Sequence, residues 1–147
     1  RGNITGPTAD ENNPTYILKA LELGFDVEID LWFLPTQPEQ NYQFFLGHDN
    51  PEYKIDYSFI LEHKEHLWIH CKEYNALQKL MNDNLNYFYH TDEDYVLTSK
   101  QYIWAYPGKY GSVNTICVKP KTFDTIQYFD GVCSDYIGVY RDKLGIV

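Results

Sequence analysis

The 147-residue sequence has few cysteines and no long apolar run. Its cysteines, Cys71, Cys117 and Cys133, are too few and too widely spaced for a disulfide framework. Each lies in an apolar stretch, so we expect buried free thiols in a reducing compartment and place the protein in the cytoplasm. No apolar run approaches the roughly 20 residues that a spanning helix needs, which predicts no membrane span.

Basic side chains are also scarce. Only 12 Lys and Arg stand against 21 Asp and Glu, which gives a net charge of −9. Such a chain lacks the basic patch of a general nucleic-acid binder, so we expect no nucleic-acid partner. The contents of hydrophobic residues (44%) and charged residues (22%) are typical of a folded protein, and the length predicts one domain over residues 1–147.

Aromatic residues, by contrast, are abundant. The chain has 14 Tyr, 8 Phe and 3 Trp, which together make up 17% of it. Many of them fall in short β-like runs, where aromatic side chains fill a core or line a groove. The sequence leaves both uses open.

Hydrophobic patterning predicts an alternation of short strands and helices. Pro14 suits a first helical turn and Gly24 a helix stop, so the first helix is expected at Thr15–Leu23. Further helices are expected at Ser58–Lys64, Tyr74–Met81 and Phe123–Phe129. The main strands are expected at Val27–Leu34, Tyr42–Gly47, Leu67–Lys72, Asn86–Tyr89, Tyr102–Tyr106, Thr115–Val118 and Gly131–Ile137, with a small extra strand at Tyr95–Leu97.

This succession of elements favours an α/β protein with parallel strands. With an eighth strand ending just before or at Arg1, the strand count predicts a compact TIM-type (β/α)8 barrel. Several of its connecting helices would be shortened and its first strand truncated, because such barrels usually run to about 250 residues. A doubly wound open sheet is the alternative fold.

The first candidate site is a pair of carboxylates in one predicted strand. Glu28 and Asp30 lie two residues apart and therefore point to the same face. Two neighbouring carboxylates repel each other unless they face water, share a proton or bind a cation. Oxygen ligands suit Mg²⁺, Ca²⁺ or Mn²⁺, so a divalent metal site is one interpretation and a solvated strand face is the other.

A second polar pair, His70 and Lys72, repeats this spacing in another strand. A single His in an apolar strand is usually a core residue with satisfied hydrogen bonds, but the Lys at the strand's carboxyl end favours a polar rim. If both strands belong to one barrel, the two pairs converge at its carboxyl-terminal rim, where barrel enzymes carry their chemistry.

The turn His48-Asp49 directly follows a predicted strand that ends at Gly47. A His at a strand end beside carboxylates can act as a general acid or base, although Asp49-Asn50-Pro51 is also ordinary turn chemistry. Other residues near predicted strand ends are His90, Trp104, Tyr106, Lys119 and Asp135. Among these, Lys119 could contact an anion, whereas Trp104 and Tyr106 would line a groove or a core.

The order of these motifs resembles that of the glycerophosphodiester phosphodiesterase family. The family reads H-R-G, E-N, E-x-D, H-D and E-x-K. This chain has Arg1-Gly2, Glu11-Asn12, Glu28-x-Asp30, His48-Asp49 and a strand ending in Lys72, at similar early spacings. The second half matches only as a succession of strands, with Ser134-Asp135 similar to the family's closing T-D motif.

The resemblance implies a TIM barrel that hydrolyses glycerophosphodiesters to an alcohol and glycerol 3-phosphate, a hydrolase of lipid metabolism with a small-molecule substrate. It implies that Glu28 and Asp30 bind the metal and that Arg1 contacts the phosphate. It also implies that His48 is a general acid or base and that Lys72 stabilises developing negative charge. With our own candidates added, the expected substrate-binding residues are Arg1, Glu11, Asn12, Lys119, Trp104 and Tyr106.

The chain departs from the family pattern at two positions. The family's first catalytic His would stand immediately before Arg1. His70 stands where the family has a metal-binding Glu, and we expect it to be the third metal ligand. Replacing a carboxylate by an imidazole weakens binding of Mg²⁺ or Ca²⁺ and shifts preference toward Mn²⁺ or Zn²⁺.

Three functions remain open on the sequence. The leading one is a metal-dependent phosphodiesterase, and the second is a phosphate- or phospholipid-headgroup-binding barrel without turnover. The third is a glycosidase using Glu28 and Asp30, which is disfavoured because glycosidases place their two carboxylates across the scissile bond rather than side by side. The sequence sets no oligomeric state.

Overall fold

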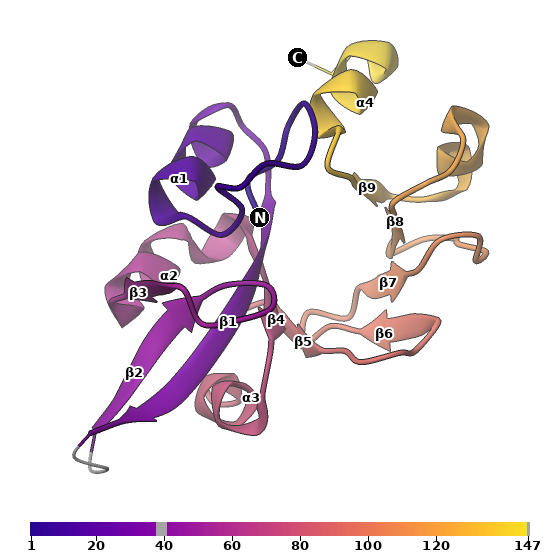
Figure 1. Ribbon diagram of the computed structural model, residues 1–147. Helices are drawn as coiled ribbons and strands as arrows, with labels where there is room; N and C mark the ends of the chain where they lie inside the picture. The colour runs from indigo at the N-terminus through magenta and orange to yellow at the C-terminus, as the bar shows by residue number, and fades with distance from the viewer. Residues whose placement is uncertain (38–40, 147) are drawn as a thin grey trace. The chain divides into compact units, whose positions relative to one another are not determined.

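The computed structural model describes residues 1–37 and 41–146 (Figure 1). The chain divides into two compact units, each of which is described by itself. The first consists of Arg1–Gly2 and Asp10–His90, and the second of Asn3–Ala9 and the chain from Thr91 onward. The expectation of a single domain over residues 1–147 stays a prediction.

The first unit is built on a five-stranded mixed sheet in the order β3-β2-β1-β4-β5. Its strands are β1 (Val27–Thr36), β2 (Asn41–Leu46), β3 (Tyr53–Ile55), β4 (Leu67–Cys71) and β5 (Tyr87–Tyr89). Strands β1, β4 and β5 run parallel, whereas β2 pairs antiparallel with both β1 and β3. The carboxyl ends of the three parallel strands therefore lie at one edge of this sheet.

The helices of this unit lie between its strands in the chain: one precedes β1, one lies between β3 and β4, and one lies between β4 and β5. They are α1 (Pro14–Glu22), α2 (Tyr57–His63) with the short 3₁₀ turn η1 (Lys64–His66), and α3 (Tyr74–Leu80). Helix α1 begins as the sequence predicts, because Pro14 occupies its first turn and the Asn13 side chain accepts a hydrogen bond from the Thr15 amide at 3.0 Å. It ends before Gly24, which has φ +81°.

The core of the first unit lies on the face of β1 that carries the odd-numbered residues. Val27, Ile29 and Leu31 are buried there, together with Ile69 of β4 and Leu80 of α3. Because side chains alternate along a strand, Glu28 and Asp30 point to the opposite face. Burial of the apolar residues on one face of β1 therefore determines that Glu28 and Asp30 lie together on the other face.

Truncating Ile69 at this core is expected to lower the free energy of unfolding. Its side chain is 0% exposed in a central strand, so Ile69→Ala leaves a cavity and should cost about 2–5 kcal/mol in urea unfolding. Ile69→Val, which removes one methylene, should cost about 0.5–1.5 kcal/mol. Equal losses for the two variants would contradict a tightly packed core at this position.

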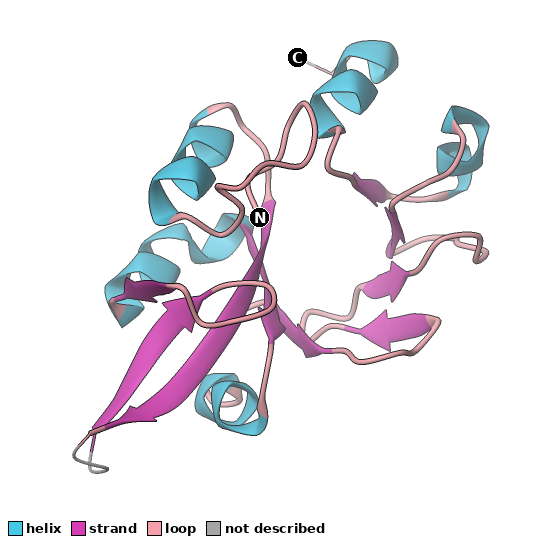
Figure 2. Cartoon of the chain, viewed as in Figure 1, coloured by secondary structure: helices cyan, strands magenta, loops and turns pink. Residues whose placement is uncertain are grey.

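The second unit holds a four-stranded sheet in the order β6-β7-β8-β9 (Figure 2). Its strands are β6 (Tyr95–Leu97), β7 (Ile103–Ala105), β8 (Thr115–Val118) and β9 (Gly131–Cys133), and only β6 pairs antiparallel. The 3₁₀ turn η2 (Phe123–Tyr128) and helix α4 (Ile137–Leu144) complete it. The segment Asn3–Ala9 also belongs to this unit, and the Gly138 amide donates a hydrogen bond to its Ile4 carbonyl at 3.1 Å.

The α/β class is confirmed, but the TIM-type barrel is wrong. The described strands form two separate mixed sheets rather than one closed parallel sheet. Strands β1 and β2 form an antiparallel hairpin that extends six residue pairs from Leu31↔Leu46. Alternating apolar residues predict a strand without its direction, so they do not distinguish this antiparallel hairpin from the all-parallel sheet of a barrel.

The end of the chain also differs from the expectation. The strand expected over Gly131–Ile137 ends at Cys133, and helix α4 follows. None of the helices in residues 1–37 and 41–146 combines the length and apolarity needed to cross a membrane.

Candidate metal centre

Three potential metal ligands meet at the carboxyl edge of the first sheet. Asp30 of β1 and His70 of β4 are partners in the parallel register, and Glu28 lies on the same face of β1. One ligand atom from each of Glu28, Asp30 and His70 lies within 4.8 Å of the other two. The period-two spacing noted in the sequence and the pairing of β1 with β4 bring these side chains together.

Asp30 is the centre of the cluster and is 0% exposed. Its Oδ2 accepts hydrogen bonds from Asn12 Nδ2 at 2.9 Å and Arg1 Nε at 3.0 Å. Its Oδ1 lies 3.1 Å from His70 Nδ1 and 3.8 Å from Lys72 Nζ. Burial by itself raises the pKa of Asp30, but the hydrogen bond from His70 and the charge of Arg1 outweigh burial and lower it, so the carboxylate stays ionised.

Asn12 fixes Asp30 through both ends of its amide. It donates to the carboxylate, and its Oδ1 accepts a hydrogen bond from the Asp30 backbone N–H at 3.0 Å. Asn12 is fully buried and adopts φ +64°, a left-handed conformation that Asn tolerates better than most residues. Its own backbone N–H donates to the Arg1 carbonyl at 3.0 Å, which holds Arg1 at the cluster.

Glu28 has the opposite pKa shift to Asp30. Burial raises its pKa, and the neighbouring negative charge of Asp30 raises it further. Arg1 Nε lies 3.4 Å from Glu28 Oε2, and Arg1 Nη1 lies 3.5 Å from Glu11 Oε2. Burial lowers the pKa of Arg1, but the charges of Glu28, Asp30 and Glu11 outweigh it and raise the pKa, so the guanidinium is permanently charged.

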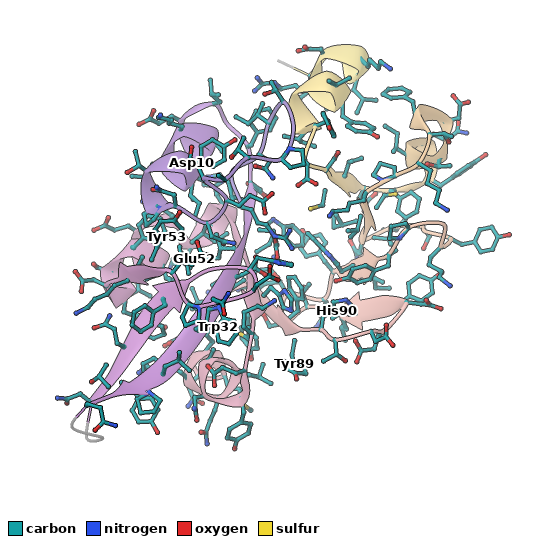
Figure 3. All side chains as sticks on the ribbon, in the orientation of Figure 1. Asp10, Trp32, Glu52, Tyr53, Tyr89 and His90 are labelled. Carbon is teal, nitrogen blue, oxygen red and sulfur yellow. The ribbon has the colours of Figure 1, made fainter. Side chains whose placement is uncertain are left out.

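His70 is oriented at both ring nitrogens. Its Nε2 lies 3.2 Å from the carbonyl oxygen of His90, the residue after β5 that Figure 3 labels beside Tyr89. Its ring also stacks on Phe88 of β5, with centroids 5.2 Å apart. Its Nδ1–H donates to Asp30 Oδ1, so a cation bound at Nδ1 would displace this proton and leave the ring proton on Nε2, facing the His90 carbonyl, which is the orientation of metal-binding histidines.

The donor atoms fit a divalent cation. Nδ1 of His70 lies 3.1 Å from Asp30 Oδ1 and 3.7 Å from Glu28 Oε1. Metal–ligand bonds of about 2.1 Å at 90–110° place neighbouring donors about 3.0–3.4 Å apart, close to these separations. Two carboxylates and one imidazole suit Mn²⁺ as well as Mg²⁺ or Ca²⁺.

His48 stands on a turn that is tied to this edge through the backbone. The Gly47 amide donates to the Asp30 carbonyl at 3.1 Å, and the indole of Trp32, labelled in Figure 3, donates to the Gly47 carbonyl at 2.7 Å. The imidazole is partly exposed, and its Nδ1 lies 2.8 Å from Asp49 Oδ1. This pairing leaves Nε2 as the ring nitrogen available for proton transfer.

Gly47 is required by the tightness of this turn. A Cβ at this position would lie 1.8 Å from the Asn50 carbonyl oxygen, so Gly47→Ala must shift the backbone next to His48. If His48 takes part in hydrolysis, we expect a loss of about 10²-fold in kcat, because a displacement of about 1 Å can cost that much. Gly24→Ala is the matched control, since it also has positive φ but its Cβ meets nothing within 4 Å. Equal activity in the two variants would contradict a role for this turn.

Three residues that the sequence predicts to bind substrate belong to the second unit. Trp104 in β7 is 5% exposed and is a core residue. Tyr106 directly follows β7 and its amide donates to the Asp94 carbonyl at 3.0 Å. Lys119 directly follows β8, and its Nζ lies 3.7 Å from Asp135 Oδ2. A substrate-binding role for the three stays a prediction.

Two contacts of the site have no signal in the sequence. The carbonyl of His90 orients His70, but every residue has a carbonyl, so no residue type marks this role. Phe88 packs on the His70 ring because β5 pairs with β4. Only the strand order reveals that pairing.

Comparison of the chain with models of known protein families, with curated proteins and with solved structures gives no match. The case for a function therefore rests on the residues of the site.

Proposed function

We propose that this chain is a divalent-metal-dependent phosphodiester hydrolase that acts on glycerophosphodiester-like small molecules. The observation that carries the proposal is the convergence of Glu28, Asp30 and His70 at one strand edge, with the cations Arg1 and Lys72 within 4 Å of Asp30. Negative ligands beside fixed positive groups suit a substrate that brings its own negative charge, such as a phosphodiester.

The three ligands would hold the cation, and the two cationic side chains would bind the phosphoryl oxygens. A metal at this position supplies Lewis-acid stabilisation of the charge that develops on phosphorus oxygens. Arg1 is anchored by Asp30 and Glu11, so its guanidinium is preorganised before substrate arrives. Lys72 approaches the cluster from the end of β4 and adds a second positive charge.

His48 would protonate the leaving group. As a water molecule attacks phosphorus and releases a proton to solvent, the P–O bond to the alcohol breaks, and the leaving alkoxide takes the proton that an imidazolium at Nε2 can donate. Asp49 orients the ring through Nδ1. The neutral imidazole left after this transfer regains its proton from solvent before the next turnover. The proposal places the enzyme in lipid metabolism in the cytoplasm.

Hydrolysis of glycerophosphocholine by the full chain tests the proposal. We expect glycerol 3-phosphate to be released with Mg²⁺, Ca²⁺ or Mn²⁺ and release to stop when a chelator is added in excess. His48→Ala should lower kcat by about 10²–10³-fold, as expected for loss of a general acid. His63→Ala is the matched control, because His63 lies at the end of α2 and makes an edge contact with Phe59.

Absence of turnover with every metal, in a protein that is folded by circular dichroism, would overturn the enzymatic proposal. The second candidate is a phosphate-binding protein without turnover, and the Arg1–Asp30 and Lys72–Asp30 contacts favour it, since they place cations at the site without a metal. That function predicts that glycerophosphocholine raises the melting temperature while no glycerol 3-phosphate forms.

A further inference from the structure

The second unit contains a pocket of about 520 Å³ that the proposed hydrolase does not use. It lies among the turn after β8, the start of η2 and helix α4. The lining residues that matter here are Lys119, Lys121, Lys143, Asp135, Phe123 and Tyr140. Its volume is within the range of about 300–1,000 Å³ that is typical of small-molecule sites.

The charge of this pocket is opposite to that of the chain. It gathers three of the 12 basic side chains of a protein whose net charge is −9. Asp135 is the one acidic residue among the described lining residues, and it is already bound by Asn3 Nδ2 at 3.0 Å and Lys119 Nζ at 3.7 Å. The lining therefore carries a net charge of +2.

Two of the lysines differ from Lys119 in their ion pairing. Neither Lys121 nor Lys143 forms an ion pair with a residue in the described part of the chain. Lys143 instead places its Nζ 5.2 Å from the centroid of the Phe123 ring. Ammonium groups collected in a concave site attract an anion more strongly than isolated surface lysines do, because the wall excludes part of the screening water.

An apolar wall stands beside these ammonium groups. Phe123 stacks on Tyr140 with ring centroids 5.9 Å apart and planes at 12°. The Tyr140 hydroxyl donates to the Pro120 carbonyl at 3.4 Å, which links α4 to the turn after β8. Val139 extends the wall. The pocket therefore offers apolar surface for the carbon part of a ligand and positive charge for its anionic part.

The turn that supplies two of the lysines is held in an uncommon conformation. Lys119 has φ +47°, which is unfavourable for a residue with a Cβ, and it precedes Pro120. Its amide donates to the Cys133 carbonyl at 2.8 Å, so pairing with the end of β9 maintains the strain. Maintained backbone strain is concentrated at ligand-binding segments.

We infer that this pocket binds a phosphate monoester dianion through Lys121 and Lys143, with the ligand's carbon part against Phe123 and Tyr140. A dianion matches the +2 lining, whereas a single carboxylate would neutralise half of it. The inference does not depend on the proposed hydrolase, because every residue of the pocket belongs to the second unit and no metal is needed.

Calorimetric titration of the metal-free full chain with phenyl phosphate tests the inference. We expect phenyl phosphate to bind about tenfold more tightly than inorganic phosphate, since burial of its ring adds apolar contact. The double variant Lys121→Gln/Lys143→Gln should weaken binding by about tenfold or more. The matched control is Lys54→Gln/Lys64→Gln, which removes the same charge from two exposed lysines of the first unit.

The variant Lys72→Gln separates this site from the metal centre, because it removes a cation beside Asp30 and leaves the pocket unchanged. Binding of phenyl phosphate that survives in Lys72→Gln supports the pocket, even if the hydrolase proposal fails. An equal loss in the two double-lysine variants, a loss in folded Lys72→Gln or no binding at all would overturn the inference.

A second experiment, with lipid vesicles, distinguishes a lipid phosphate monoester from a free one. Sedimentation with phosphatidylcholine vesicles that contain phosphatidic acid, lost in Lys121→Gln/Lys143→Gln, would assign the dianion to a lipid headgroup. Binding of phenyl phosphate without such sedimentation would assign it to a free small molecule. Both results support the site.

Discussion

Replacing Asp30 by asparagine is expected to reduce metal-dependent hydrolysis to the background rate. The variant keeps the shape of the side chain but removes the charge that faces His70, Arg1 and Lys72. Asp30 is both a proposed metal ligand and the partner of two cations, so we expect a fall of at least about 10³-fold in kcat/KM, or about 4 kcal/mol of transition-state stabilisation.

The same substitution should also lower stability. The pKa of Asp30 is depressed in the folded state, so the carboxylate contributes stability that is present above its unfolded pKa of about 3.9 and is lost as the pH falls through the folded value. Breaking a buried ion pair by removing one partner costs about 3–5 kcal/mol, and Asp30→Asn should show this loss at pH 7 in urea unfolding.

The matched control is Asp26→Asn, just before β1. Asp26 also accepts hydrogen bonds in the first unit, from His66 at 2.9 Å and Trp68 at 3.1 Å, but it is half exposed and lies at the other end of the strand. We expect full activity in this variant. Activity measured per folded molecule separates chemistry from unfolding, and wild-type activity in folded Asp30→Asn would refute the metal centre.

The candidate site was more predictable than the fold because its residues depend on local periodicity. Glu28 and Asp30 share a face for any strand direction, since side chains alternate with a period of two. The same argument predicts a shared face for His70 of β4 and Lys72, which directly follows that strand. Bringing the two pairs together needs only that β1 and β4 be parallel neighbours, as the structure has them.

The fold required information that a single strand does not carry. Phe33↔Phe44 and Leu34↔Gln43 pair across an antiparallel hairpin, yet the same apolar residues suit a strand of either direction. Helix α4 was missed because none of its residues is buried, so the apolar stripe that identifies a surface helix is weak there. The helix end at Gly145, with φ +65°, was the available signal.

The oppositely shifted pKa values of Glu28 and Asp30 lead to the second large prediction. Burial and the charge of Asp30 raise the pKa of Glu28, so the folded chain holds this proton more tightly than the unfolded chain does. Stability from Glu28 is therefore greatest below its unfolded pKa of about 4.3 and falls as the pH rises toward the folded value. At pH 7 without metal, Glu28 therefore contributes less stability than it does below its unfolded pKa.

Glu28→Gln should accordingly be more stable than wild type without metal and nearly inactive with it. Glutamine keeps the size of the side chain and removes the repulsion with Asp30. We expect a higher melting temperature in metal-free buffer at pH 7, by about 3 °C for each kcal/mol gained in a chain of this length. Because a metal ligand is lost, kcat/KM should fall by at least about 10³-fold.

Adding metal should reverse the order of stability. A metal that binds only the folded state stabilises wild type by about 2.7 kcal/mol at 100 times its Kd, whereas Glu28→Gln gains little. The exposed Glu62 provides the control Glu62→Gln, which should follow wild type in both buffers. A structural role for Glu28 could explain a change in stability in one buffer, but only a metal ligand predicts that the melting curves exchange places when metal is added. Parallel curves for wild type and Glu28→Gln in both buffers would therefore exclude Glu28 as a ligand.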